Sequence, residues 1–143
     1  MTSAASTTRT ETGPAFVGTT PTGGAIAHDL AAAIAVLSHR GYVPVTTATY
    51  NAGDTLRVLI GRRPGTAGER AFFFDQTIYL GTDASAPSAQ ITLADQNDTE
   101  VTLNYGIYRP GALAAGGERP VRFVLDMGQL NAMDPLPSVA QRR

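Results

Sequence analysis

Four residues in predicted loops or at a strand end have side chains suited to binding a ligand or partner: Asp83, Tyr108, Arg109 and Asp134. Arg109 ends a predicted strand just before Pro110 and Gly111, and functional groups often lie in such loops. Its guanidinium can form a bidentate ion pair with Asp83 or Asp134, or it can anchor an anionic ligand. We favour the ion pair and keep ligand anchoring as the alternative, so these four residues are the candidate site.

No catalytic constellation is recognisable. The chain has no cysteine, which excludes disulfides and thiolate chemistry, and two histidines, His28 and His39, which cannot build a metal site on several imidazoles. No serine lies in a Gly-x-Ser-x-Gly elbow, and no glycine-rich loop is followed by Lys and Ser or Thr. The aspartates at positions 75, 83, 95 and 98 match no calcium loop and are typical of turns. We expect no enzyme, metal or cofactor, and keep an enzyme using loop carboxylates as the third hypothesis.

The composition limits the classes of partner that we expect. The chain has 143 residues and a net charge of −1, and all eleven of its basic residues are arginine. So small a net charge does not favour nucleic acid or an anionic membrane as partner. No stretch is long and apolar enough to span a bilayer, and the N-terminus lacks the basic and then apolar pattern of a signal peptide. Either the protein is cytoplasmic, or a signal was removed before this sequence begins.

One helix is predicted over residues 26–40, where apolar side chains recur at helical spacing. Asp29 near its start suits the positive end of the helix dipole, and His39 suits the negative end. Gly41 is a natural stop. The helix has an apolar stripe that needs a partner surface.

About seven short strands follow, and their short connections predict antiparallel pairing. Residues 42–50 are rich in Val, Thr and Tyr, and residues 56–60 alternate as a strand with one buried face. Residues 99–108 alternate most regularly, with Val101, Leu103, Tyr105 and Ile107 on one face. Phe72–Phe74 must point to both faces, so we expect them in the core, with base stacking beside Arg70 as the weaker alternative.

These elements predict an α+β fold, in which one antiparallel, mostly β sheet of about seven strands carries the helix on one face. Residues 1–24 are predicted to form a flexible Thr/Ser/Gly/Pro arm, residues 25–137 a single domain and residues 138–143 a tail.

A set of short segments, mostly in the second half of the chain, resembles the LppP/LprE family of actinobacterial lipoproteins. These segments are Phe72–Phe74, Tyr79–Asp83 followed by Pro87, Ile91–Leu93, Val101–Leu103 with Tyr105, Tyr108–Pro110, Gly116–Gly117, Val121–Phe123 and Asp134–Pro137. The resemblance implies a small exported domain, tethered by an N-terminal lipid and without established enzymatic activity. The sequence departs from the family because it has no lipobox cysteine and has Ala114–Ala115 where relatives often carry cysteine.

The departures leave a trimmed mature domain or a non-lipidated relative as alternatives. Our first hypothesis is a non-enzymatic extracytoplasmic domain of the cell envelope that binds a protein or small ligand as an accessory module. The second is a structural subunit of a larger assembly, whose terminal arms become ordered against neighbours.

Overall fold

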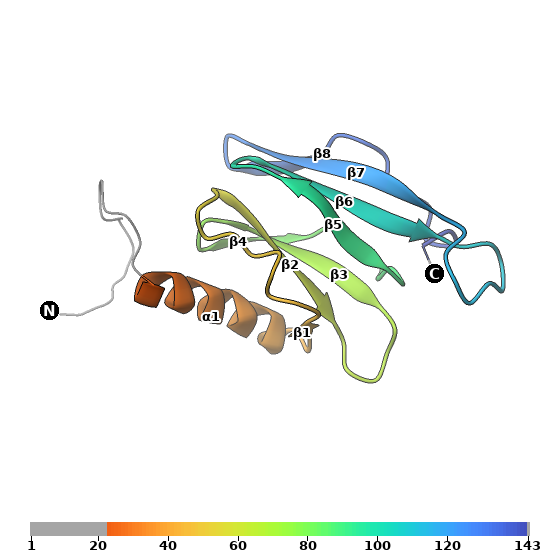
Figure 1. Cartoon of the computed structure of the whole chain (residues 1–143), viewed down its shortest axis with the longest axis horizontal. Helices are drawn as coiled ribbons and strands as arrows, with labels where there is room; N and C mark the ends of the chain where they lie inside the picture. Colours follow the sequence, from red (N-terminus) through yellow and green to blue (C-terminus); the bar gives the residue numbers. More distant parts are fainter. Residues whose placement is uncertain (1–22, 143) are drawn as a thin grey trace, which may run out of the picture.

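The computed structural model describes residues 23–142 (Figure 1). They form one helix and eight strands, namely α1 (Gly23–His39), β1 (Val43–Pro44), β2 (Leu56–Arg62), β3 (Glu69–Asp75), β4 (Ile78–Thr82), β5 (Ile91–Gln96), β6 (Glu100–Ile107), β7 (Gly117–Asp126) and β8 (Gln129–Ala132). The predicted arm at residues 1–24 lies outside the described residues, except for Gly23 and Gly24, which belong to α1.

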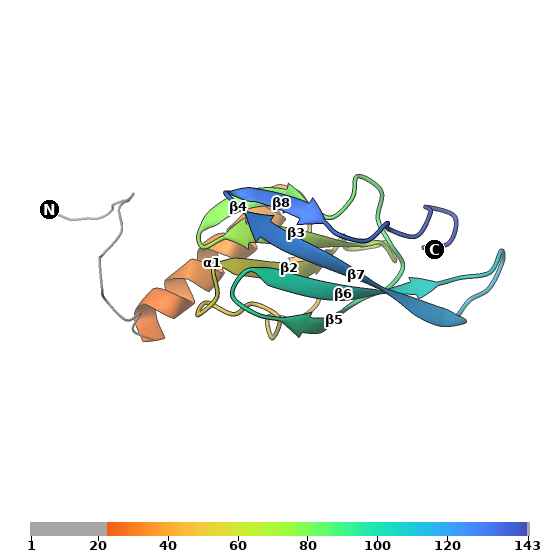
Figure 2. The ribbon, with the colours of Figure 1, turned by 90° about the horizontal axis from the view of Figure 1, so that it is seen from above.

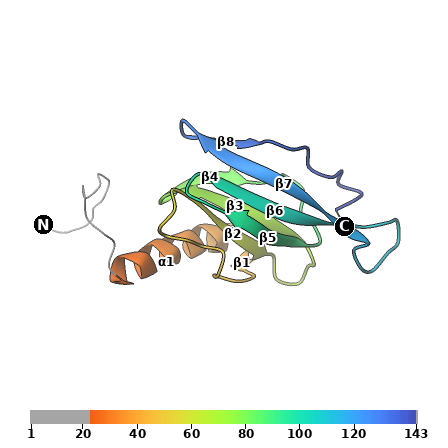
Figure 3. The ribbon, with the colours of Figure 1, turned by 45° about the horizontal axis from the view of Figure 1, so that its top comes forward.

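The strands form two antiparallel sheets of four, in the orders β1-β2-β3-β4 and β5-β6-β7-β8. The α+β class is confirmed, but the prediction of one sheet of about seven strands was wrong. Figure 1 shows the two sheets stacked, with α1 on the outer side of the first, and Figures 2 and 3 turn the second sheet toward the reader. The domain therefore has three layers rather than two. The segment between β4 and β5 carries the chain from one sheet to the other. A connection of this length could also have joined two neighbouring strands of one sheet, so the sequence did not reveal the change of sheet.

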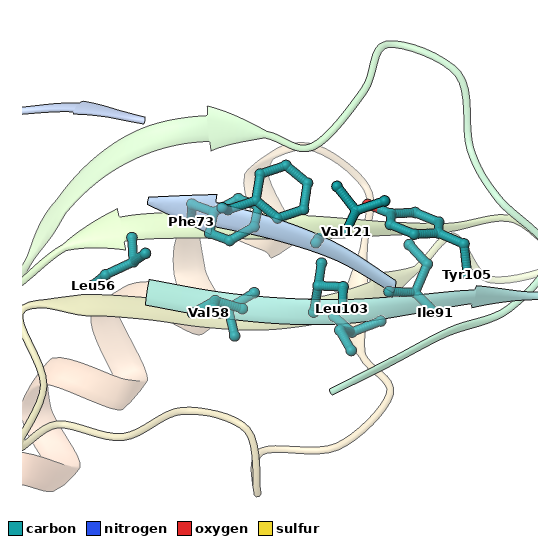
Figure 4. Close-up of a cluster of buried hydrophobic side chains, with 11 residues drawn as sticks. Leu56, Val58, Phe73, Ile91, Leu103, Tyr105 and Val121 are labelled. Carbon is teal, nitrogen blue, oxygen red and sulfur yellow. The ribbon is translucent and has the colours of Figure 1, made fainter. Parts of the chain in front are cut away.

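The larger core lies between the two sheets (Figure 4). Leu56 and Phe73 from the first sheet meet Leu103 and Tyr105 from the second, and all four are fully buried. The phenyl rings of Phe73 and Phe123 lie 4.8 Å apart between centroids. The predicted alternation of Val101, Leu103 and Tyr105 toward the core is confirmed.

The second core lies between α1 and the first sheet. Ala33 and Leu37 of the helix pack with Phe72 and Phe74 of β3, so the phenylalanine run points to both faces as predicted. Strand β2 is buried on both faces from Leu56 to Gly61, which corrects the prediction of one buried face. The helix is the cause, because it covers the face that would otherwise meet solvent.

The end of α1 fits the sequence signals. Gly41 has a φ of 81°, a conformation that favours glycine. Its N–H bonds the carbonyl of Ser38, and the N–H of Tyr42 bonds that of Leu37, the pair of bonds that defines a Schellman motif. The start differs, because α1 begins at Gly23 and places Asp29 beyond the first turn, where it pairs with Arg57 instead of the dipole.

Residues 42–50 form only the short strand β1, which corrects the longer strand predicted there. Pro44 has no N–H for strand pairing. Beyond it, the hydroxyl of Thr46 accepts a bond from the N–H of Ala48, and the carbonyl of Thr47 accepts one from the N–H of Tyr50. These local bonds turn the chain despite its β-branched composition.

The C-terminal residues, predicted as a tail, pack on their own domain as far as Arg142. The N–H of Ala89 bonds the carbonyl of Arg142, and the N–H of Tyr108 bonds that of Gln141. The guanidinium of Arg142, which is 5% exposed, donates to the carbonyls of Pro137 and Ala86. These contacts hold residues 138–142 against one end of the sandwich.

Candidate functional site

Asp83, the first sequence-predicted site residue, follows β4 and is half-buried. Its carboxylate accepts hydrogen bonds from the backbone N–H of Ala71, at 3.0 Å, and from the hydroxyl of Tyr105, at 2.6 Å. Burial raises the pKa of Asp83, while these bonds and the charge of Arg142 act in the opposite direction. The carboxylate therefore belongs to a polar tie between the two sheets.

Tyr105 is fully buried on β6, and the structure gives it a partner that the sequence did not predict. Burial raises the pKa of its phenol, and the negative charge of Asp83 raises this pKa further. The raised pKa favours the protonated phenol, which donates to the carboxyl group of Asp83.

Asp134, Tyr108 and Arg109 lie in other surroundings. The exposed carboxylate of Asp134 accepts a bond from the backbone N–H of Arg122 at 3.0 Å, which prolongs the β7–β8 pairing. Tyr108 is half-buried, and the exposed Arg109 follows it. Among residues 23–142, no hydrogen bond or ion pair connects any two of Asp83, Tyr108, Arg109 and Asp134, and Arg109 does not form the expected ion pair.

A different group of side chains lines a shallow hollow on the surface of the first sheet. We call it the Arg–Tyr hollow and define it by Arg40, Tyr42, Arg63, Arg70 and Tyr79. It consists of two shallow compartments of about 260 and 320 Å³ that share three of these residues. Thr66, Gly68 and Pro87 complete the smaller compartment, and Phe72 and Thr82 complete the larger one.

The five defining residues of the hollow come from four separate pieces of the chain. Arg40 follows α1, and the turn at Gly41 brings Tyr42 back against the first sheet. Arg63 follows β2, Arg70 lies on β3, and Tyr79 lies on β4. The site therefore sits where the C-terminal end of α1 meets the first sheet.

The arginines stack on the tyrosines. The guanidinium carbon of Arg40 lies 4.4 Å from the ring centroid of Tyr79, and those of Arg63 and Arg70 lie 5.1 and 5.6 Å from the ring of Tyr42. A guanidinium held over an aromatic ring can still donate its N–H groups to an acceptor. Tyr42 is only 5% exposed, so it is a fixed support for two cations.

The hollow carries uncompensated positive charge within residues 23–142. The two ion pairs in this part of the chain, Arg57–Asp29 and Arg62–Glu69, use other arginines. Arg40 donates to the carbonyl of Val36 and Arg70 to that of Ser85, which are neutral acceptors. The Nε of Arg70 is buried and has no partner in the described structure. Guanidinium groups so arranged can bind carboxylate, sulfate or phosphate oxygens.

Sequence analysis did not predict this hollow, because its residues are neighbours only in the folded chain. Two weak signals pointed toward it, namely Arg70 beside the phenylalanine run and the exclusive use of arginine as the basic residue. Neither specifies which arginines meet.

Two further kinds of site, a metal centre and a membrane-spanning helix, were sought in the described part of the chain. Residues 23–142 contain no cluster of three or more His, Asp or Glu side chains arranged to hold a metal ion. The helix described here is too short or too polar to cross a membrane.

Comparison with known proteins gives one match. The family model described as LppP/LprE lipoprotein matches residues 45–126, more than half of the chain. The match spans β2 to β7 and includes Arg63, Arg70 and Tyr79, but stops before Asp134. No curated protein and no solved structure matches the chain.

Proposed function

This chain belongs to the LppP/LprE lipoprotein family, and from that premise we propose that it is a non-enzymatic, extracytoplasmic accessory module that binds an anionic ligand in the Arg–Tyr hollow. The family description supports a place in the cell envelope. The hollow supports binding, because it offers charged donors on rigid aromatic supports.

The observation that carries the proposal is that three guanidiniums share one concave surface without a carboxylate partner in residues 23–142. Like charges repel, so three neighbouring cations destabilise the fold unless a bound anion compensates them. Arginine packing on tyrosine contributes about 0.5–1 kcal/mol at exposed sites. Packing on tyrosine alone therefore gives only a weak reason for three neighbouring cations.

The non-enzymatic role is supported by the use of the loop carboxylates. Asp83 is bonded to Tyr105 and Ala71, and Asp134 to the backbone of Arg122. Each is engaged within the fold, and neither contacts Arg109 in the described structure. An acid–base pair needs groups placed together around a substrate.

Titration of the isotope-labelled protein with inorganic phosphate tests the binding site. We expect the side-chain Nε–H resonances of Arg40, Arg63 and Arg70 to shift saturably and the resonance of Arg109 to stay in place. Arg63→Gln should weaken this saturable binding, whereas Arg109→Gln should leave it unchanged. If Arg109→Gln weakened the binding and Arg63→Gln did not, the binding site would be the loop at Arg109 instead. Equal, unsaturated shifts at all exposed arginines would exclude a specific site.

The envelope location is tested separately, by fractionating cells of the source organism and detecting the product of the complete gene. Recovery with the envelope or the medium supports the proposal. Recovery only with the cytoplasm would contradict it.

A further inference from the structure

We propose that the Arg–Tyr hollow binds two oxyanion groups of one ligand together, so that its ligand is a diphosphate or a similar linear anion. This inference rests on the proposed anion-binding function and specifies its ligand class. Three features of the hollow support it: its two compartments, the residues that line both of them and the number of its charges.

Tyr42, Arg63 and Arg70 line both compartments. Both guanidiniums lie over the same tyrosine ring. An anionic group in either compartment therefore reaches the same pair of cations. Two groups joined by a short bridge can occupy both compartments at once.

The volumes of the compartments allow two anionic groups to bind. They measure about 260 and 320 Å³, so each has room for one phosphate group.

The charges lead to the same ligand class. A phosphate monoester carries a charge of about −1.5 to −2 at neutral pH, so one such group leaves the three guanidiniums partly uncompensated. Two linked phosphates supply a charge of about −3 to −4, which is enough to compensate all three guanidiniums. Arg40, which lies over the ring of Tyr79, lines only the larger compartment. It can therefore contact the anionic group in that compartment but not the group in the smaller one.

Calorimetric titrations with inorganic phosphate and with pyrophosphate test the inference. We expect pyrophosphate to bind about ten- to hundredfold more tightly, because each additional charged hydrogen bond contributes about 1.5–3 kcal/mol. Equal affinity for the two anions would overturn this inference and leave the proposed function standing. Absence of binding by both would overturn the proposed function itself.

Variants separate the two compartments. Arg40→Gln should weaken pyrophosphate binding far more than phosphate binding, and so remove the preference for pyrophosphate. Arg63→Gln should weaken both anions, and Arg109→Gln, outside the hollow, should change neither. If Arg40→Gln weakens both anions equally, with unchanged circular dichroism, the two compartments do not act separately and the inference fails.

A diphosphate can be free or attached to a lipid, and vesicles distinguish these sources. Retention on phosphatidylcholine vesicles that carry farnesyl diphosphate, but not on those with farnesyl monophosphate, supports a lipid diphosphate. Tight binding of pyrophosphate without retention on either vesicle supports a soluble one. Equal retention on both vesicles, with no preference for pyrophosphate, would count against recognition of two groups.

Discussion

The hydroxyl of Tyr105 donates to the carboxylate of Asp83 across 2.6 Å and so joins the second sheet to the loop that leaves the first. Tyr105 is fully buried, and the raised pKa of its phenol keeps the donor protonated. The other carboxylate oxygen of Asp83 accepts from the N–H of Ala71, in the first sheet. A single side chain thus connects both layers of the sandwich.

Tyr105→Phe should destabilise the domain by about 1–3 kcal/mol, because it removes the donor and leaves a partly buried carboxylate with one partner fewer. Urea unfolding measures this change as a lower midpoint with an unchanged slope. Tyr108→Phe is the matched control, since the hydroxyl of Tyr108 has no hydrogen-bond partner among residues 23–142, and it should change the stability by less than about 0.5 kcal/mol. Equal losses in both variants would argue against the inter-sheet role.

The Asp83 carboxyl makes stability depend on pH. Burial raises its folded-state pKa above the ordinary value of 3.8, so the folded protein holds this proton more tightly than the unfolded chain. The stability that the group contributes is complete below pH 3.8 and is lost as the pH rises through the raised pKa.

Asp83→Asn isolates this effect, because the amide can accept from Ala71 and donate to the hydroxyl oxygen of Tyr105. We expect the stability of the wild type, relative to Asp83→Asn, to fall as the pH is raised above 3.8 in urea-unfolding series. A relative stability that rises with pH would mean that the hydrogen bonds outweigh burial.

The sequence predicted the alternation of buried residues along the strands well, but it did not predict which layer of the fold covers each face. Alternation placed Val101, Leu103 and Tyr105 on one face because neighbouring strand residues point in opposite directions. The same rule cannot say which second surface covers a strand. Arg57 marks this limit: in sequence it is typical of a solvent face, yet it is buried beneath α1 beside Asp29.

The candidate site was predictable only in part, because proximity in the folded chain decides it. Asp83 was named for its loop position, and the structure shows why it matters in its bond to Tyr105. Arg40 and Arg63 lie 23 positions apart in the chain and meet only after α1 docks on β2 and β3. No local motif carries that information.

Gly61→Ala should weaken the docking of α1. A Cβ at this position would lie 2.9 Å from Cδ2 of Leu37 and 3.1 Å from the ring of Phe72, closer than normal contact. Overpacking of this kind costs about 1–3 kcal/mol, and urea unfolding measures it. Gly117→Ala, at a strand position with open space around its Cβ, is the control. If the two variants are equally stable, the helix is not closely packed at Gly61.

Asp29→Asn should destabilise the domain because it leaves the guanidinium of Arg57 without its counter-charge. Arg57 is 7% exposed, and its Nη1 lies 3.2 Å from the Asp29 carboxylate and 3.1 Å from the hydroxyl of Tyr50. We expect a loss of about 1–3 kcal/mol in urea unfolding. Asp75→Asn, at a carboxylate without a side-chain partner in the described structure, should cost less than about 0.5 kcal/mol. A smaller loss for Asp29→Asn than for this control would contradict the role of the ion pair.

Arg142→Ala should release the C-terminal residues and change the titration of Asp83 at the same time. The guanidinium satisfies the carbonyls of Pro137 and Ala86, so its removal should cost about 1–3 kcal/mol and speed amide exchange of residues 138–142. Its positive charge also lowers the pKa of Asp83, so the pKa of this carboxyl should rise in the variant and the pH-dependent loss should move to higher pH. Arg119→Ala, an exposed arginine on β7, should produce neither effect. Faster exchange with an unchanged titration of Asp83 would show that Arg142 acts through packing alone, since a charge effect must appear in the carboxyl that it stabilises.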